Sequence, residues 1–114
     1  MSSSTLISRF TGAAGVTAAN TFIQPGKPFE LLEVRVHLNA ASATSENLVI
    51  SLDGGAAAAK YDTVLATQDM NTVADYVYTP TRPHRFTHGS DKLIMTWTNT
   101  NTKTYGIEIV YRHI

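Results

Sequence analysis

The feature that most constrains the fold is an alternation of apolar and polar residues with a period of two. Residues 32–38 show it most clearly, with leucine and valine at even positions and Glu, Arg and His at odd positions. Successive side chains of a strand point to opposite faces, so one face belongs to a core and the other to water or a partner. Phe29 and Leu31 have the opposite parity, which predicts a β-bulge near Leu31 and Leu32.

The same period recurs at residues 48–52, 93–97 and 105–111. Weaker strands are expected at residues 5–10, 20–23, 63–67, 75–79 and 84–88. Turn residues separate these segments, and residues 99–103 are interpreted as a hairpin loop between the last two strands. About eight short strands at near-regular spacing predict an all-β, single-domain antiparallel sandwich or small barrel.

Two short helical candidates, residues 40–46 and 55–60, are too short to be stable alone and are assigned to loops. The apolar faces of the strong strands supply the expected core. It consists of Leu32, Val34, Val36, Leu38, Ile50, Leu52, Leu93, Met95, Trp97, Ile107 and Ile109.

Charge and cysteine content exclude several classes of function. Nine basic residues balance nine acidic ones without any basic run, which argues against binding to nucleic acid. The absence of cysteine removes disulfides, thiol catalysis and cysteine-ligated zinc. Only 16% of the residues are charged, a low fraction that favours buried contact surface in an assembly. Neither a signal peptide nor an apolar stretch of about 20 residues is found.

No catalytic or metal-binding constellation is apparent, so we expect no enzyme, no metal and no cofactor. The histidines are His37, His84, His88 and His113. His84 and His88 share a strand face by parity, but no third ligand lies near them in the sequence, and zinc sites usually show closer spacing. The aspartates are scattered, and the serines lack a nucleophile-elbow motif.

The aromatic residues offer the best candidate interface. Trp97 shares the parity of Leu93 and Met95 and is assigned to the core. Tyr76 and Tyr78 share one face of their strand, with Val77 on the other, and are the best candidates for exposed aromatics. Exposed tyrosine is favoured at protein interfaces and at sugar-binding sites alike. With the nearby side chains these tyrosines define a candidate interface of Tyr76, Tyr78, Arg82 and His84.

Residues 1–19 differ in composition from the rest of the chain. They are rich in Ser, Ala, Gly and Thr, with few large apolar residues. We expect this segment to be either a flexible tail or an arm that orders on a partner, with residues 20–114 forming the sandwich domain.

Four segments together resemble a family of small proteins: residues 28–38, 46–53, 67–71 and 99–109. Their strand and turn patterns are similar to those of auxiliary virion proteins of tailed phages, of the capsid decoration or cement type. The resemblance implies a jelly-roll-like sandwich, made in the host cytoplasm and located on the virion. It also implies a capsid or other virion protein as partner and assembly as a small homo-oligomer. It carries no functional residue.

Two other functions remain open at this point. The first is a carbohydrate- or receptor-binding module of a phage tail or fibre, for which a concave aromatic strip is the expected mark. The second is a small β-sandwich enzyme, which needs titratable groups clustered in a pocket.

Overall fold

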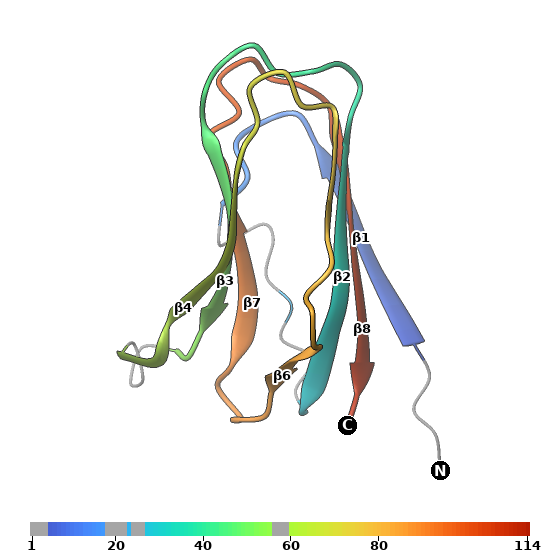
Figure 1. Cartoon of the computed structure of the whole chain (residues 1–114), viewed down its shortest axis with the longest axis vertical. Coiled ribbons are helices and arrows are strands. Elements are labelled where there is room, and N and C mark those ends of the chain that lie inside the picture. Colours follow the sequence, from blue (N-terminus) through green and yellow to red (C-terminus); the bar gives the residue numbers. More distant parts are fainter. Residues whose placement is uncertain (1–4, 18–22, 24–26, 56–59) are drawn as a thin grey trace.

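The computed structural model describes residues 5–17, 23, 27–55 and 60–114. Within them the chain forms two facing antiparallel sheets, and the first strand begins at the end of the molecule where the chain ends (Figure 1). The eight strands are β1 (Thr5–Gly12), β2 (Phe29–Leu38), β3 (Asn47–Asp53), β4 (Thr63–Asp69), β5 (Asp75–Tyr78), β6 (His84–Phe86), β7 (Lys92–Thr96) and β8 (Tyr105–His113).

The predicted all-β antiparallel sandwich is confirmed. The larger sheet has the order β1-β8-β2-β5, with β6 also paired to β2, and the smaller sheet has the order β4-β3-β7. The described residues contain no α-helix, and none of their segments is a helix long and apolar enough to cross a membrane. Residues 40–46 form a loop as predicted, whereas most of residues 55–60 and of the expected strand at residues 20–23 lie outside the described residues.

The bulge predicted near Leu31 and Leu32 is also confirmed. The register of β2 against β8 shifts between Leu31 and Glu33, so that Leu31 and Val34 both face the core and are fully buried. Leu32 is the extra residue of this bulge and is only half-buried, which corrects its assignment to the core. A bulge residue is left unpaired, and it reverses which of the following positions face the core. Leu32 therefore does not share the inward face of Val34, although both have even numbers.

The core lies between the two sheets and contains nine of the eleven predicted residues. Leu52 is the second exception, because it lies near the end of β3 and packs against the core only partly. Phe29 and Phe86 stack at one end of the core with their ring centroids 4.5 Å apart. The buried predicted residues are Val34, Val36, Leu38, Ile50, Leu93, Met95, Trp97, Ile107 and Ile109.

Residues 99–103 do not form a hairpin loop, which corrects the prediction. They connect β7 in the smaller sheet to β8 in the larger sheet, so the two strands that they join are not neighbours. Asn99 organises this crossing. Its buried side-chain amide donates to the carbonyl oxygens of Ala14 at 3.1 Å and Lys103 at 3.0 Å, and its Oδ1 accepts from the Lys103 N–H at 3.0 Å.

Part of the N-terminal segment at residues 1–19 lies in the larger sheet. Residues 5–12 form β1, which pairs with β8 along its whole length. Val16 is buried and bridges to Trp97 of the smaller sheet. Phe10 packs against the core from β1, and together with Val16 it supplies the apolar contacts that join this segment to the domain.

Candidate interaction faces

The outward face of the larger sheet carries a ladder of charges. Arg9, Glu108 and Arg35 lie in one row across β1, β8 and β2, and directly opposed residues share a face. The Nε atom of Arg9 donates to Oε2 of Glu108 at 2.8 Å. Arg35 lies 3.9 Å from the other oxygen of Glu108 and also donates to Glu33. Each guanidinium in this row is therefore neutralised by a carboxylate.

A second row of charges crosses the same face near the C-terminus. Oε1 of Glu30 accepts from the Nε atom of Arg112 at 2.8 Å, and Oε2 lies 3.4 Å from the Nε atom of Arg85. His37 and Asp75 pair at the other end of the sheet. Four arginines and four carboxylates cancel, so this surface is highly polar and has no net charge. We call it the charged face: Arg9, Glu30, Glu33, Arg35, Asp75, Arg85, Glu108 and Arg112.

The outward face of the smaller sheet is different, because its centre has no charged residue. Val49 is flanked by Thr67 and Thr96, and Ser51 is flanked by Val64 and Ile94. Charged residues stand only at its ends, where Asp53 is opposite Lys92 and Asp69 is opposite Asn47. We call this the uncharged face: Val49, Ser51, Val64, Thr67, Ile94 and Thr96.

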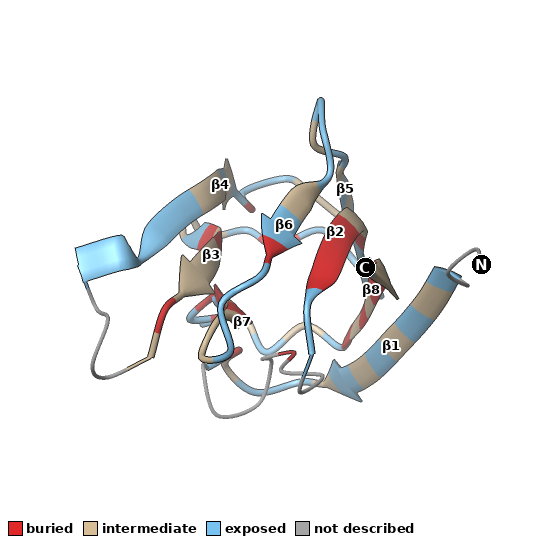
Figure 2. Cartoon of the chain, turned by 90° about the horizontal axis from the view of Figure 1, so that it is seen from below, coloured by how far each residue is buried: buried red, intermediate tan, exposed pale blue. Residues whose placement is uncertain are grey.

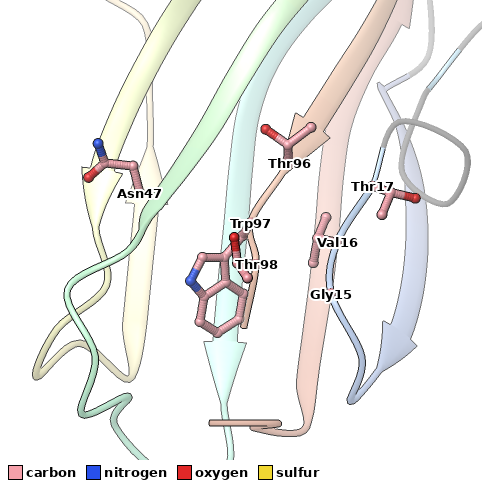
Figure 3. A pocket seen from close by; sticks show the side chains of 7 residues that line it. All are labelled: Gly15, Val16, Thr17, Asn47, Thr96, Trp97 and Thr98. Carbon is pink, nitrogen blue, oxygen red and sulfur yellow. The ribbon is translucent and has the colours of Figure 1, made fainter. Parts of the chain in front are cut away.

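A shallow hollow of about 440 Å³ adjoins one end of the uncharged face. Figure 3 shows Asn47, Thr96 and Thr17 around it, with Gly15 and Val16 on the segment that follows β1. Trp97 and Thr98 complete its lining, which contains no charged residue. The hollow is a depression at the end of an otherwise flat sheet surface, and it is large enough to accept a side chain of a partner.

These two faces differ in how easily they give up water. Burying the charged face against a partner removes water from eight ionic groups that already have partners within the chain, which costs free energy without new compensation. Burying the uncharged face removes water from valine and isoleucine, which is favourable, and from hydroxyl groups that can find new partners. Val64, on the edge strand β4, is 61% exposed. The uncharged face is therefore the better candidate for a protein interface.

The structure does not place the predicted interface tyrosines on an open surface. Tyr76 and Tyr78 lie opposite Val36 and Val34 on the inward side of β5, and both are half-buried against the core. Burial raises the pKa of both phenol groups. Val77 is the exposed residue of this strand, at 57%. The two tyrosines share a face as predicted, but that face points inward because β5 pairs with the core strand β2.

The other two predicted interface residues are His84, the first residue of β6, and Arg82, in the turn before it. His84 accompanies Tyr78, with its Nε2 atom 2.6 Å from the tyrosine oxygen, and the two rings stack. Arg82 is exposed in the preceding turn. His88 lies beyond the end of β6, where its Nδ1 atom is 3.0 Å from the Ser90 hydroxyl. The described residues contain no group of three His, Asp or Glu side chains placed to hold a metal ion.

The uncharged face was missed in the sequence, although its signal was present. The outward positions of residues 32–38 carry Glu33, Arg35 and His37, whereas those of residues 48–52 and 93–97 carry only Val49, Ser51, Ile94 and Thr96. Comparing the polar sides of the strands, and not only their apolar sides, distinguishes the two faces. Val64 and Thr67 could be added only once the pairing of β4 with β3 was known.

Comparison with known protein families and with curated proteins finds no match. Among solved structures the chain is similar to one in the acidic stable capsid structure of Helicobacter pylori bacteriophage KHP30, with a TM-score of 0.49 and 13% identity over 99% of this chain and 94% of that one. A likeness at this level does not identify a function, so the functional proposal rests on the surfaces of the sandwich.

Proposed function

We propose that this protein is a non-enzymatic structural component of a phage virion that decorates the outside of the capsid. The single observation that carries the proposal is the contrast between the two faces of the sandwich. One outward face carries a network of ion pairs beside the exposed Ile7 and Val77. The other has no charged residue at its centre and presents Val49, Val64 and Ile94 among hydroxyl residues. A sheet with such an uncharged outward face is suited to docking on another protein. The resemblance to decoration proteins in the sequence indicates what that protein is.

The energetics of decoration fit a small flat face. A three-stranded sheet of this size offers a modest interface, below about 1,200 Å² in total, which is typical of weak complexes. A capsid repeats the same site many times, and linked copies of a weak binder gain affinity by orders of magnitude through effective concentration. Because the site exists only on the assembled shell, binding stabilises the shell relative to free subunits.

The proposal includes a jelly-roll topology. Two backbone bridges, Val16 to Trp97 and Ile23 to Leu93, lie along the edge of the smaller sheet next to β7. If these bridges count as one strand position, and β5 and β6, which pair with successive parts of β2, count as another, each sheet has four positions. β1 then neighbours β8 in the larger sheet, and the new position neighbours β7 in the smaller one. This nesting of antiparallel pairs is the wrapping of a jelly roll. Viral capsid and lectin domains share that architecture, so it supports a binding role without choosing the partner.

The competing function is carbohydrate or receptor binding by a tail or fibre module. That idea is based on an exposed aromatic strip. Tyr76 and Tyr78 are instead half-buried against the core, and Tyr61 is the most exposed aromatic residue among those described, which favours decoration. The experiment is to mix the protein with undecorated capsids of its own phage and to pellet them. Co-sedimentation at a fixed stoichiometry with a raised disruption temperature supports decoration. Retention on a polysaccharide column without capsid binding overturns it.

A further inference from the structure

The edges of the two sheets are protected to very different degrees. Natural sheets block their edges with short strands, prolines, bulges or covering segments, because an open edge pairs with other chains. The β5 and β6 edge is split into strands of four and three residues by a turn that contains Pro80 and Pro83. β4 has a register irregularity near Val64. Ile23 bridges to Leu93 of β7, and Val16 bridges to Trp97 just after it.

Within the part of the chain that the structure describes, β1 has none of these protections. It is an edge strand of eight residues that pairs with β8 in an unbroken register and contains no proline. Its one charged residue, Arg9, is held on the outward face by Glu108. Figure 2 shows β1 extending away from the strands of the smaller sheet. Its inward residues Leu6 and Phe10 are accordingly only half-buried, whereas Ile107, opposite Phe10 on β8, is buried.

We propose that β1 pairs antiparallel with β1 of a second copy of this chain, joining two larger sheets into one continuous sheet around a two-fold axis. In such a pair the same strand serves both partners, so its side chains must complement themselves. The inward residues of β1 have even numbers. The core-facing sides of both copies lie on one side of the joined sheet only if even-numbered residues of one β1 are opposite even-numbered residues of the other. A register centred on Arg9 places the Arg9 residues of the two copies directly opposite each other, and their charges repel. A register centred on Ile7 pairs fewer residues of the two strands.

The register symmetric about Ser8 fits best. It opposes Leu6 of one copy to Phe10 of the other, which covers the two half-buried apolar side chains of β1. It also opposes Ile7, which is 50% exposed, to Arg9, whose aliphatic stem can lie along it. The unpaired backbone groups of both edges become hydrogen-bonded over seven residues, from Thr5 to Thr11.

The proposed dimer has a geometric consequence for binding. A two-fold axis normal to the continuous sheet leaves both smaller sheets on the same side, so the two uncharged faces point in the same direction. Two docking faces directed at one surface bind bivalently. Dimerisation itself does not depend on the proposed function, because β1 and the uncharged face belong to different sheets. A monomer that still pellets with capsids, or a dimer that does not, distinguishes the two proposals.

The first test measures association of the full chain by sedimentation velocity over a wide range of concentration. Ile7→Lys places a lysine opposite Arg9 of the partner twice per dimer, and we expect the dissociation constant to rise by about tenfold. Ile7→Glu places an opposite charge there and should tighten the dimer. The matched control is Val77→Lys, which changes an equally exposed valine on the outward face of the other edge of the same sheet and should leave association unchanged.

The second test reads the register directly and does not depend on how Ile7 variants fold. The chain has no cysteine, so Ser8→Cys introduces a single thiol. In the proposed dimer the two residues at position 8 are directly opposed, with Cβ atoms about 4.5–5.5 Å apart, which is close to disulfide distance. Rapid oxidation to a covalent dimer, faster than that of Thr67→Cys on the β4 edge, supports the proposal. A chain that stays monomeric at millimolar concentration, or equal oxidation of both variants, overturns it.

Discussion

Arg112 on β8 donates from its Nε atom to Oε1 of Glu30 on the neighbouring strand β2, at 2.8 Å, and Glu30 is only 6% exposed. The hydrogen bond from Arg112 lowers the pKa of this carboxyl, burial opposes the shift, and the charges of Arg112 and Arg85 add to it. The most buried acid of the charged face is thus held ionised by two arginines on the strands beside it.

This arrangement predicts an acid-sensitive contribution to stability. Because the pKa of Glu30 is lower in the folded chain than in the unfolded chain, its contribution is present above the ordinary carboxyl pKa of about 4.3 and is lost as the pH falls through the folded value. Glu30→Gln should therefore lower the urea midpoint at pH 7, and the difference from the parent should shrink in acid. A difference that stays constant between pH 7 and pH 2.5 contradicts this account.

The crossing between the two sheets depends on Asn99. Its φ of 52° lies in the left-handed region, which asparagine tolerates better than most residues, and its side chain bonds three carbonyl groups and one N–H. Asn99→Ala leaves buried polar groups without partners and should cost about 1–3 kcal/mol in unfolding free energy. Asn99→Gly relieves the backbone only, so it should recover part of that loss; denaturant titration of both variants checks the order.

Trp97 carries a polar atom that the core does not satisfy. Within the part of the chain that the structure describes, its Nε1 atom has no hydrogen-bond acceptor, although the residue is buried. Trp97→Phe removes this N–H along with some volume, and the two effects oppose each other. We expect Trp97→Phe to cost less than about 1.5 kcal/mol and Trp97→Ala about 3–5 kcal/mol. Equal losses in the two variants would show that the indole N–H is satisfied.

The register of β8 is tested by a pair of isoleucines. Ile107 on β8 is 1% exposed and Ile7 on the adjacent β1 is 50% exposed. Ile107→Ala deletes buried methyl and methylene groups and should cost roughly 2–5 kcal/mol, whereas Ile7→Ala should change the monomer by less than about 0.5 kcal/mol. Thermal melts at low protein concentration make the comparison; an Ile107→Ala variant that melts like the parent would place this residue outside the core.

Strands were predictable where one side of the chain is consistently apolar. The period of two identified β2, β3, β7 and β8, because a face packed on a core tolerates few polar residues. Even the change of parity at Leu31 signalled the bulge. What failed was information that lies in pairing: residues 99–103 have hairpin composition, but which sheet each flanking strand joins is decided by contacts distant in sequence.

The candidate site was harder to predict for the same reason. Tyr76 and Tyr78 alternate with Val77, and parity alone cannot say which of two mixed faces turns inward. Pairing with Val34 and Val36 turns the tyrosines toward the core. The uncharged face required three strands to be placed side by side, and β4 reaches it through an irregular register.

The most direct test of the account is whether capsid binding depends on the uncharged face. Val64→Lys places a charge on that face, at its β4 edge, and Val77→Lys places the same charge on the charged face; the two residues are 61% and 57% exposed. Both variants should fold like the parent. When each is pelleted with undecorated capsids, we predict that Val64→Lys stays in the supernatant while Val77→Lys co-sediments like the parent. Binding by Val64→Lys at parent levels, or loss of binding by Val77→Lys alone, would contradict the account.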